Sequence, residues 1–181
     1  MKVLGLVGEK GSGKQTFVNF LKEIAPSLNI RQVRFSDILA QTLVLWDIPI
    51  TRPNLQKLAI AMNETFGAHA LADAAKFSIE GDTADVIILD GIRRQAEYDL
   101  MKQMGGQVIY ITAGQDLRYQ RLKLRSEKVG EVGLTFEQFL KEEKSKAESE
   151  IPKISKKTDL KIENNGTLEE FKAIIKELKL F

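Results

Sequence analysis

The chain of 181 residues has no cysteine and a single histidine, His69. The absence of cysteine excludes disulfides, thiolate nucleophiles and cysteine-based metal sites. With no second histidine and no cysteine to share a metal ion with, His69 is expected to be structural. No zinc-type site is therefore predicted.

Long apolar runs and strong net charge are also missing. No segment approaches the roughly 20 apolar residues of a membrane span, and the N-terminal apolar segment is too short for a signal peptide. Lys and Arg number 27 against 25 Asp and Glu, and the resulting charge of +2 argues against a general nucleic-acid binder. The hydrophobic content of 43% and the charged content of 29% are typical of a soluble globular protein. We expect one cytoplasmic domain over residues 1–181, with no nucleic-acid or membrane partner.

The most informative stretch is Lys2 to Thr16 (KVLGLVGEKGSGKQT), an apolar run that breaks into a glycine-rich loop and a lysine. The run predicts a central parallel strand buried on both faces. Apolar residues then recur at helical spacing at Phe17, Phe20, Leu21 and Ile24. Gly8, Gly11 and Gly13 permit positive φ and leave the backbone N–H groups able to point at one anion, and the helix start adds its own N–H groups and dipole. We interpret the loop as a phosphate cradle in which Lys14 reaches the β- and γ-phosphates of a nucleotide.

The loop departs by one residue from the pattern G-x-x-x-x-G-K-[ST]. Gln15 stands where the magnesium-binding hydroxyl belongs, and Thr16 follows one place later as a second candidate metal contact. This variant resembles the loop of adenylate-kinase-type enzymes, which implies that Mg²⁺ is held mainly by phosphate oxygens and water. The alternative is a tight glycine turn with a solvated Lys14, but the glycines, the lysine and the strand-to-helix context together favour the cradle.

The second strong signal is Asp85 to Arg94 (DVIILDGIRR). Four apolar residues predict a buried strand that delivers Asp90 to the cradle, where a carboxylate can orient the waters around Mg²⁺. Gly91 permits the close approach of a ligand. Arg93 or Arg94 can bind the phosphate of an acceptor, and an ordinary strand followed by a helix start does not explain this doubled arginine.

Between these two signals the sequence predicts an acceptor-binding region. Ser36 and Asp37 follow a predicted strand at Ile30–Phe35, at the edge where open α/β sheets bind ligands, and they fit a substrate contact or a helix cap equally well. Residues 37–80 carry no further strand signal and predict an all-helical insertion. Its polar candidates are Arg52, Gln56 and Lys57. Arg52 is favoured because a guanidinium binds phosphate bidentately, whereas Lys57 fits a solvated surface.

A basic helix is predicted after a strand at Gln107–Thr112. Arg118, Arg121 and Arg125 are spaced by three and four residues and share one face. Like charges on one face are unfavourable unless something negative meets them, so we interpret residues 113–150 as a lid whose arginines meet the transferring phosphoryl group. A solvated cationic helix is the alternative. The mixed charge run from Lys141 to Lys157 is interpreted as a solubilising surface without chemistry.

Weaker signals at Asp159–Glu163 and in the final helix complete five strands that alternate with helices, which predicts a three-layer α/β domain with a parallel sheet. The cradle at Gly8–Thr16, the segment Asp90-Gly91-Ile92-Arg93, the arginine helix and the segment Ile162–Glu170 (IENNGTLEE) together resemble P-loop nucleoside monophosphate kinases. Deoxynucleoside monophosphate kinases and dephospho-coenzyme A kinases are the most similar members. This resemblance implies the strand order 2-3-1-4-5, ATP and Mg²⁺ as cofactors, and a nucleotide as the small-molecule partner of a monomer or homodimer.

The resemblance also implies roles for individual residues. ATP phosphates would be bound by the loop, at Gly8, Gly11, Ser12, Gly13, Lys14, Gln15 and Thr16. Asn164 or Asn165 would lie near the adenine ring, and Asp90 would serve Mg²⁺. Arg93 or Arg94 would hold the acceptor phosphate, while the lid arginines would steady the transferred group.

Three functions remain open from the sequence. Transfer of the γ-phosphoryl group of ATP to a nucleoside or deoxynucleoside monophosphate is favoured, because the acceptor phosphate is already an anionic nucleophile. Phosphorylation of a sugar hydroxyl on dephospho-coenzyme A is the second, and there Asp37 would serve as the base. The third is an ATP-dependent switch or adaptor, which the arginine-rich lid disfavours because a switch needs only the cradle and mobile loops.

Overall fold

The computed structural model describes residues 1–124, 135–145 and 148–181. Its centre is a five-stranded sheet in the order β2-β3-β1-β4-β5, and every pairing is parallel. The strands are β1 (Lys2–Val7), β2 (Ile30–Arg34), β3 (Val86–Ile92), β4 (Gln107–Thr112) and β5 (Leu160–Glu163). The α/β class, the parallel sheet and the order 2-3-1-4-5 are thereby confirmed.

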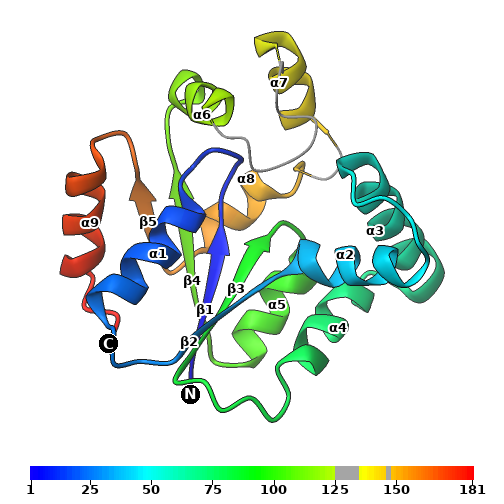
Figure 1. The fold of residues 1–181 in the computed structure, drawn as a ribbon, viewed down its shortest axis with the longest axis horizontal. Helices are drawn as coiled ribbons and strands as arrows, with labels where there is room; N and C mark the ends of the chain where they lie inside the picture. Colours follow the sequence, from blue (N-terminus) through cyan, green and yellow to red (C-terminus); the bar gives the residue numbers. More distant parts are fainter. Residues whose placement is uncertain (125–134, 146–147) are drawn as a thin grey trace.

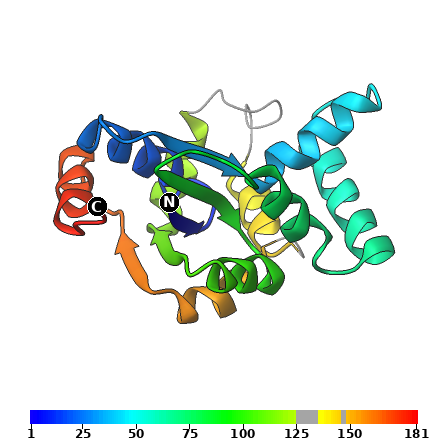
Figure 2. The same cartoon turned by 90° about the horizontal axis from the view of Figure 1, so that it is seen from below.

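Helices cover both faces of this sheet and give the three layers (Figures 1 and 2). One apolar core joins the sheet to α1 and α9, and a second joins it to α2, α4, α5 and α8. The helices are α1 (Lys14–Ile24), α2 (Phe35–Leu45), α3 (Arg52–Phe66), α4 (Ala70–Ser78), α5 (Gln95–Gln103), α6 (Gln115–Lys123), α7 (Phe136–Glu143), α8 (Ile151–Ile154) with the 3-10 turn η1 (Ser155–Lys157), and α9 (Leu168–Glu177). In Figure 1, α6 and α7 lie above the carboxyl ends of the strands.

The two central strands explain how the sequence places the loop and Asp90. Residues 3–7 of β1 are all buried, as the continuous apolar run requires of a strand covered on both faces. Leu6 lies opposite Asp90, but Val7 lies opposite Ile92, so Gly91 is an extra residue in β3. Gly91 has φ +90, a conformation that a β-bulge with glycine accommodates. Asp90 was predicted at the strand end, and the structure instead places it within the strand, beside this bulge.

One boundary differs from the prediction because helix α2 begins earlier than the sequence signal suggests. Phe35 is the first residue of α2 and Arg34 is its N-cap, so Ser36 and Asp37 lie in the first turn and the interpretation as a helix cap is wrong. A buried Phe35 fixes this early start, because its ring must reach the core. At α6 the helix begins at Gln115 and ends at Lys123, and Arg125 lies outside the described residues.

The insertion between β2 and β3 is packed lightly. Helix α3 contains no buried residue, and large apolar side chains are exposed at the end of α2 and beyond, among them Leu45 and Trp46 at 83% and 75%. Across the described ranges, no helix is long and apolar enough to cross a bilayer.

Candidate active site

The loop between β1 and α1, residues 8–14 and called the P-loop from here on, has the backbone of an anion cradle. Gly11 and Gly13 have φ +73 and +105, values that favour glycine. Neighbouring elements also approach the loop closely. A Cβ on Gly11 would lie 2.5 Å from the carbonyl oxygen of Arg118, and one on Gly13 would collide with the amide of Asn164. Glycine is therefore needed both for the turn and for its contacts with α6 and with the segment after β5.

Lys14 begins α1 and turns back over the P-loop. Its Nζ donates to the carbonyl oxygens of Gly8 at 2.6 Å and Glu9 at 3.0 Å. Desolvation of the ammonium lowers the pKa of Lys14 from 10.5 to about 8, an effect that the nearby Asp90 carboxylate partly offsets. An anion at this position would restore the favourable charge environment that the ammonium lacks.

The displaced pKa of Lys14 predicts a pH-dependent stability. Between about pH 8 and 10.5 the unfolded chain keeps a proton that the folded protein has released, so the free energy of unfolding rises with pH in this window. Relative to a Lys14→Met variant, the wild type should gain about 1 to 2 kcal/mol between about pH 7 and about pH 9.5. Urea unfolding of both proteins at the two pH values measures this, and a constant difference between them would contradict the lowered pKa.

Gln15 joins a polar network on the β2 side of the P-loop. Its side-chain oxygen accepts hydrogen bonds from Arg34 and, at 3.1 Å, from Gln32. Gln32 also donates to one carboxylate oxygen of Asp90 at 2.8 Å, and the Nε of Arg34 lies 3.8 Å from the same oxygen. The residue that replaces the usual hydroxyl thus orients two donors toward Asp90.

Asp90 fits a metal role better than Gln15 does. It is 6% exposed, and its second carboxylate oxygen is buried without a hydrogen-bond partner, which suits an acceptor for metal-bound water. The Gln15 oxygen already accepts two bonds. Among the described residues, no cluster of three or more His, Cys, Asp or Glu side chains is placed to hold a metal by itself. Any Mg²⁺ here would thus rely on phosphate and water ligands.

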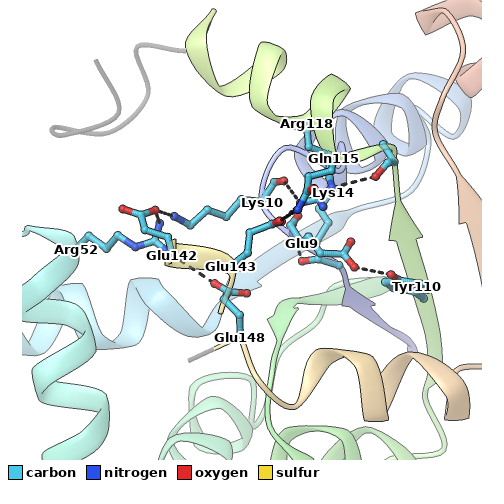
Figure 3. Close-up of polar contacts among 12 residues, drawn as sticks. Glu9, Lys10, Lys14, Arg52, Tyr110, Gln115, Arg118, Glu142, Glu143 and Glu148 are labelled. Carbon is cyan, nitrogen blue, oxygen red and sulfur yellow. Dashed lines mark hydrogen bonds and ion pairs between the residues drawn. The ribbon is translucent and has the colours of Figure 1, made fainter. Parts of the chain in front are cut away.

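Two predicted acceptor arginines meet at one carboxylate. Nη2 of Arg52 on α3 lies 3.6 Å from Oε1 of Glu148, and Nη1 of Arg93 after β3 lies 3.2 Å from the same oxygen. Glu142 on α7 lies 3.6 Å from Nη1 of Arg52 and also pairs with Lys10 of the P-loop. Figure 3 shows these carboxylates between the insertion and the P-loop.

Glu142, Glu143 and Glu148 fall in the charge run from Lys141 to Lys157, which was interpreted as a solubilising surface without chemistry. The structure instead pairs them with Lys10, Arg118 and Arg93, and their side chains are 34%, 17% and 8% exposed. The absence of chemistry in this run stays a prediction. Their sequence signal is weak, because an interspersed Glu and Lys run is typical of a solvated surface.

Arg118 is buried in protein contacts. Its Nε donates to Ala113 O at 2.9 Å, and its Nη1 donates to Lys10 O at 3.4 Å and to the Glu143 carboxylate. Its guanidinium also lies 5.6 Å from the centroid of the Phe139 ring. The clustered arginines of this helix face were expected to need a negatively charged partner. For Arg118 that partner is the Glu143 carboxylate. Arg118 joins α6, α7 and the P-loop, and Arg121 donates to Asn164 at 3.4 Å.

The two asparagines after β5 form hydrogen bonds with the backbone of neighbouring loops. Asn164 is 4% exposed and donates to the carbonyl oxygen of Ser12 at 2.9 Å, which ties β5 to the P-loop. Asn165 accepts from the backbone N–H of Gly114 at 2.7 Å and links the starts of α6 and α9. Asn164 therefore lies against the P-loop, and Asn165 lies against the start of α6.

Other predicted residues are less closely joined to the P-loop. Within the described chain, the side chains of Ser36, Asp37, Gln56 and Arg94 make no hydrogen bond or ion pair with P-loop residues, and Asp37 is exposed. Thr16 lies partly buried in the first turn of α1, next to Gln15. His69 is exposed at the start of α4.

Glu9 and Glu97 belong to the site although no motif marked them. Glu9 of the P-loop accepts from the Tyr110 hydroxyl, and burial together with this bond raises the pKa of Tyr110 to about 12. Glu97 is 3% exposed and accepts from the backbone N–H groups of Arg93 and Arg94 at 2.6 and 3.1 Å, so it fixes the backbone that carries both arginines. Burial raises the pKa of Glu97. An Arg-x-x-Glu spacing at a helix start is the signal that could have found it.

Known proteins resemble this chain in sequence or in fold. A UPF0200 protein of Methanoregula boonei is 29% identical over 182 residues, covering 98% of this chain and 96% of the relative. The crystal structure of shikimate kinase from Bacteroides thetaiotaomicron superposes with a TM-score of 0.60 at 14% identity, covering 98% of this chain and 97% of that one. TT1252 from Thermus thermophilus gives 0.59 at 19% identity, with 98% of both chains covered. At these identities the two structures establish a common fold.

A protein family described as the AAA domain matches residues 4–151. The match begins in β1, includes the whole P-loop and ends at the start of α8. It covers more than half of the chain and contains Lys14, Asp90 and the arginines discussed above. The chain therefore belongs to the AAA domain family.

Proposed function

We propose that the protein is an ATP-dependent phosphotransferase that moves the γ-phosphoryl group of ATP to the phosphate of a nucleoside or deoxynucleoside monophosphate. The observation that carries this proposal is the placement of Arg52 and Arg93. The guanidiniums of Arg52 and Arg93 come from separate segments and lie together on the side of the P-loop away from α9. The positive charge of Arg93 is close enough to lower the pKa of Lys14. Paired guanidiniums suit a dianionic phosphate.

Each part of the site has a task in this reaction. The P-loop N–H groups and Lys14 bind the β- and γ-phosphates of ATP. Arg52 and Arg93 bind the acceptor monophosphate, one oxygen of which attacks the γ-phosphorus while the bond to the β–γ bridging oxygen breaks and ADP leaves. Because that oxygen is already anionic, the protein needs only to position the two anions and to neutralise their charge.

The remaining residues complete the proposal. Asp90 and the phosphate oxygens would hold Mg²⁺ with its waters, and the metal would neutralise charge on the phosphates. Residues 37–80 would form the acceptor insertion of a single domain over 1–181. Residues 113–150 would form the lid, with Arg118, Arg121 and Arg125 serving the transferred group. Asn164 or Asn165 would contact the adenine ring of ATP.

The test is ATP consumption with Mg²⁺ against all ribo- and deoxynucleoside monophosphates and dephospho-coenzyme A. We expect one or a few monophosphates to raise the rate at least tenfold above hydrolysis without an acceptor. Stimulation by dephospho-coenzyme A alone would overturn the proposal. It would favour the hydroxyl-phosphorylating alternative, in which Asp37, in the first turn of α2, acts as the base. A rate that no acceptor raises would favour the switch or adaptor.

A further inference from the structure

We propose that Glu148 is a positioning residue of the acceptor site, whose carboxylate holds Arg52 and Arg93 at one point beside the P-loop. The inference rests on the proposed function, because it takes these two arginines to be the ones that bind the acceptor anion. It assigns a task to a residue that no sequence motif marks and that touches neither the P-loop backbone nor the predicted metal site.

The geometry of Glu148 is that of a shared anchor. A single oxygen, Oε1, lies 3.6 Å from Nη2 of Arg52 and 3.2 Å from Nη1 of Arg93. The residue is 8% exposed, so water competes little for the carboxylate. Figure 3 shows Glu148 pointing up toward Arg52 and Glu142 from the chain that leads into α8. One carboxylate thus joins α3, the end of β3 and the segment before α8.

The backbone of Glu148 is tied to helix α8, which is anchored in the core. The carbonyl oxygen of Glu148 accepts from Ile151 N at 3.2 Å, and Ile151 and Ile154 of α8 are 2% and 0% exposed in the core beneath the sheet. Helix α3, which begins at Arg52, buries no residue. Its partly buried Leu55, Leu58 and Ala59 pack against the edge of the core, and the ion pairs of Arg52 with Glu148 and Glu142 add polar contacts at its first turn.

The charges around Glu148 also favour its role in positioning the two arginines. Arg93 lowers the pKa of Lys14 and Glu148 raises it, so all three charges lie within reach of one another. Without the carboxylate, two guanidiniums and an ammonium would repel one another at this end of the sheet. Glu148 reduces that repulsion and lets the arginines converge before an acceptor arrives, which lowers the cost of organising the site on binding.

The opposite interpretation is that Glu148 occupies the acceptor position and must be displaced. The burial of Glu148 argues against this. A carboxylate displaced from its two arginine partners would be a buried charge without a partner, which is energetically costly. The side chain of Arg93 is 37% exposed, so it can present further N–H groups to an anion while it remains paired. The two interpretations predict opposite changes in acceptor affinity when the charge of Glu148 is removed.

The experiment compares the full-length wild type with Glu148→Gln, Glu148→Asp and the surface control Glu23→Gln, whose side chain is 53% exposed. For the acceptor found in the panel, Glu148→Gln should raise KM by about 10- to 100-fold and leave the KM for ATP within about threefold. The acceptor KM of Glu148→Asp, which keeps the charge on a shorter side chain, should lie between those of the wild type and Glu148→Gln. Amide hydrogen exchange without substrates should become faster across residues 52–66 in Glu148→Gln, while β1 and β3 stay protected.

An acceptor KM that is unchanged or lower in Glu148→Gln would overturn the proposal, as would unchanged exchange in residues 52–66. If no acceptor stimulates ATP consumption, the proposed function fails by itself. The exchange comparison then still decides whether Glu148 positions α3, because it needs no reaction.

Discussion

Replacing Lys14 with methionine is expected to reduce acceptor-dependent ATP consumption by about 10²- to 10³-fold, the effect typical of removing one donor aimed at developing charge. The Nζ of Lys14 donates hydrogen bonds to two carbonyl oxygens of the loop, at 2.6 and 3.0 Å. Desolvation lowers the pKa of Lys14 to about 8. Nucleotide phosphates would replace those carbonyls with full negative charges. Methionine has similar length but offers no donor and no charge.

This loss should not come from unfolding. Because the ammonium is desolvated in the folded protein, its removal is not expected to destabilise the chain near neutral pH. Lys22→Met is the matched control, since Lys22 is exposed in the last turn of the same helix. Steady-state kinetics at saturating ATP, with thermal unfolding as a check, measure the effect. Activity of Lys14→Met within tenfold of the wild type would mean that Lys14 is not aimed at the transferred phosphate.

Local sequence patterns predicted the features whose partners are close in the chain. The run Val3–Val7 predicted a strand buried on both faces, and the glycines with Lys14 predicted the cradle. Positive φ and apolar periodicity are local properties that a sequence displays directly. The strand order came from the resemblance to P-loop kinases, because local patterns indicate strands without fixing which ones pair.

The features that escaped prediction depend on contacts between distant segments. Glu148 meets Arg52 and Arg93 across 96 and 55 positions of the chain, and its own neighbourhood resembles a solvated charge run. The bulge at Gly91 depends on the register of β1 against β3. The early start of α2 depends on Phe35 reaching the core. None of these has a local signature, because each is decided by packing or charge between segments that the fold brings together.

Replacing Gly11 with alanine is expected to weaken ATP binding by about 10²-fold, an amount comparable to a misplacement of about 1 Å at a reacting site. Two costs combine at this position. An alanine at φ +73 is strained by about 1 to 2 kcal/mol, and its Cβ would lie 2.5 Å from the Arg118 carbonyl oxygen and 3.0 Å from two more Arg118 backbone atoms. Backbone cannot swing aside as a flexible side chain can, so the P-loop or the start of α6 must shift.

Gly81→Ala separates the strain from the collision. Gly81 has the same φ of +73, but a Cβ there meets no atom within 4 Å, and the residue lies between α4 and β3, beyond the amino end of that strand. This variant should lose stability to a similar conformational strain and keep ATP affinity within about threefold of the wild type. Calorimetric titration with ATP, alongside thermal unfolding of both variants, makes the comparison. If Gly11→Ala binds ATP as tightly as Gly81→Ala does, the approach of Arg118 does not hold the P-loop in shape, and the cradle must be fixed instead by Asn164 through its bond to the Ser12 carbonyl.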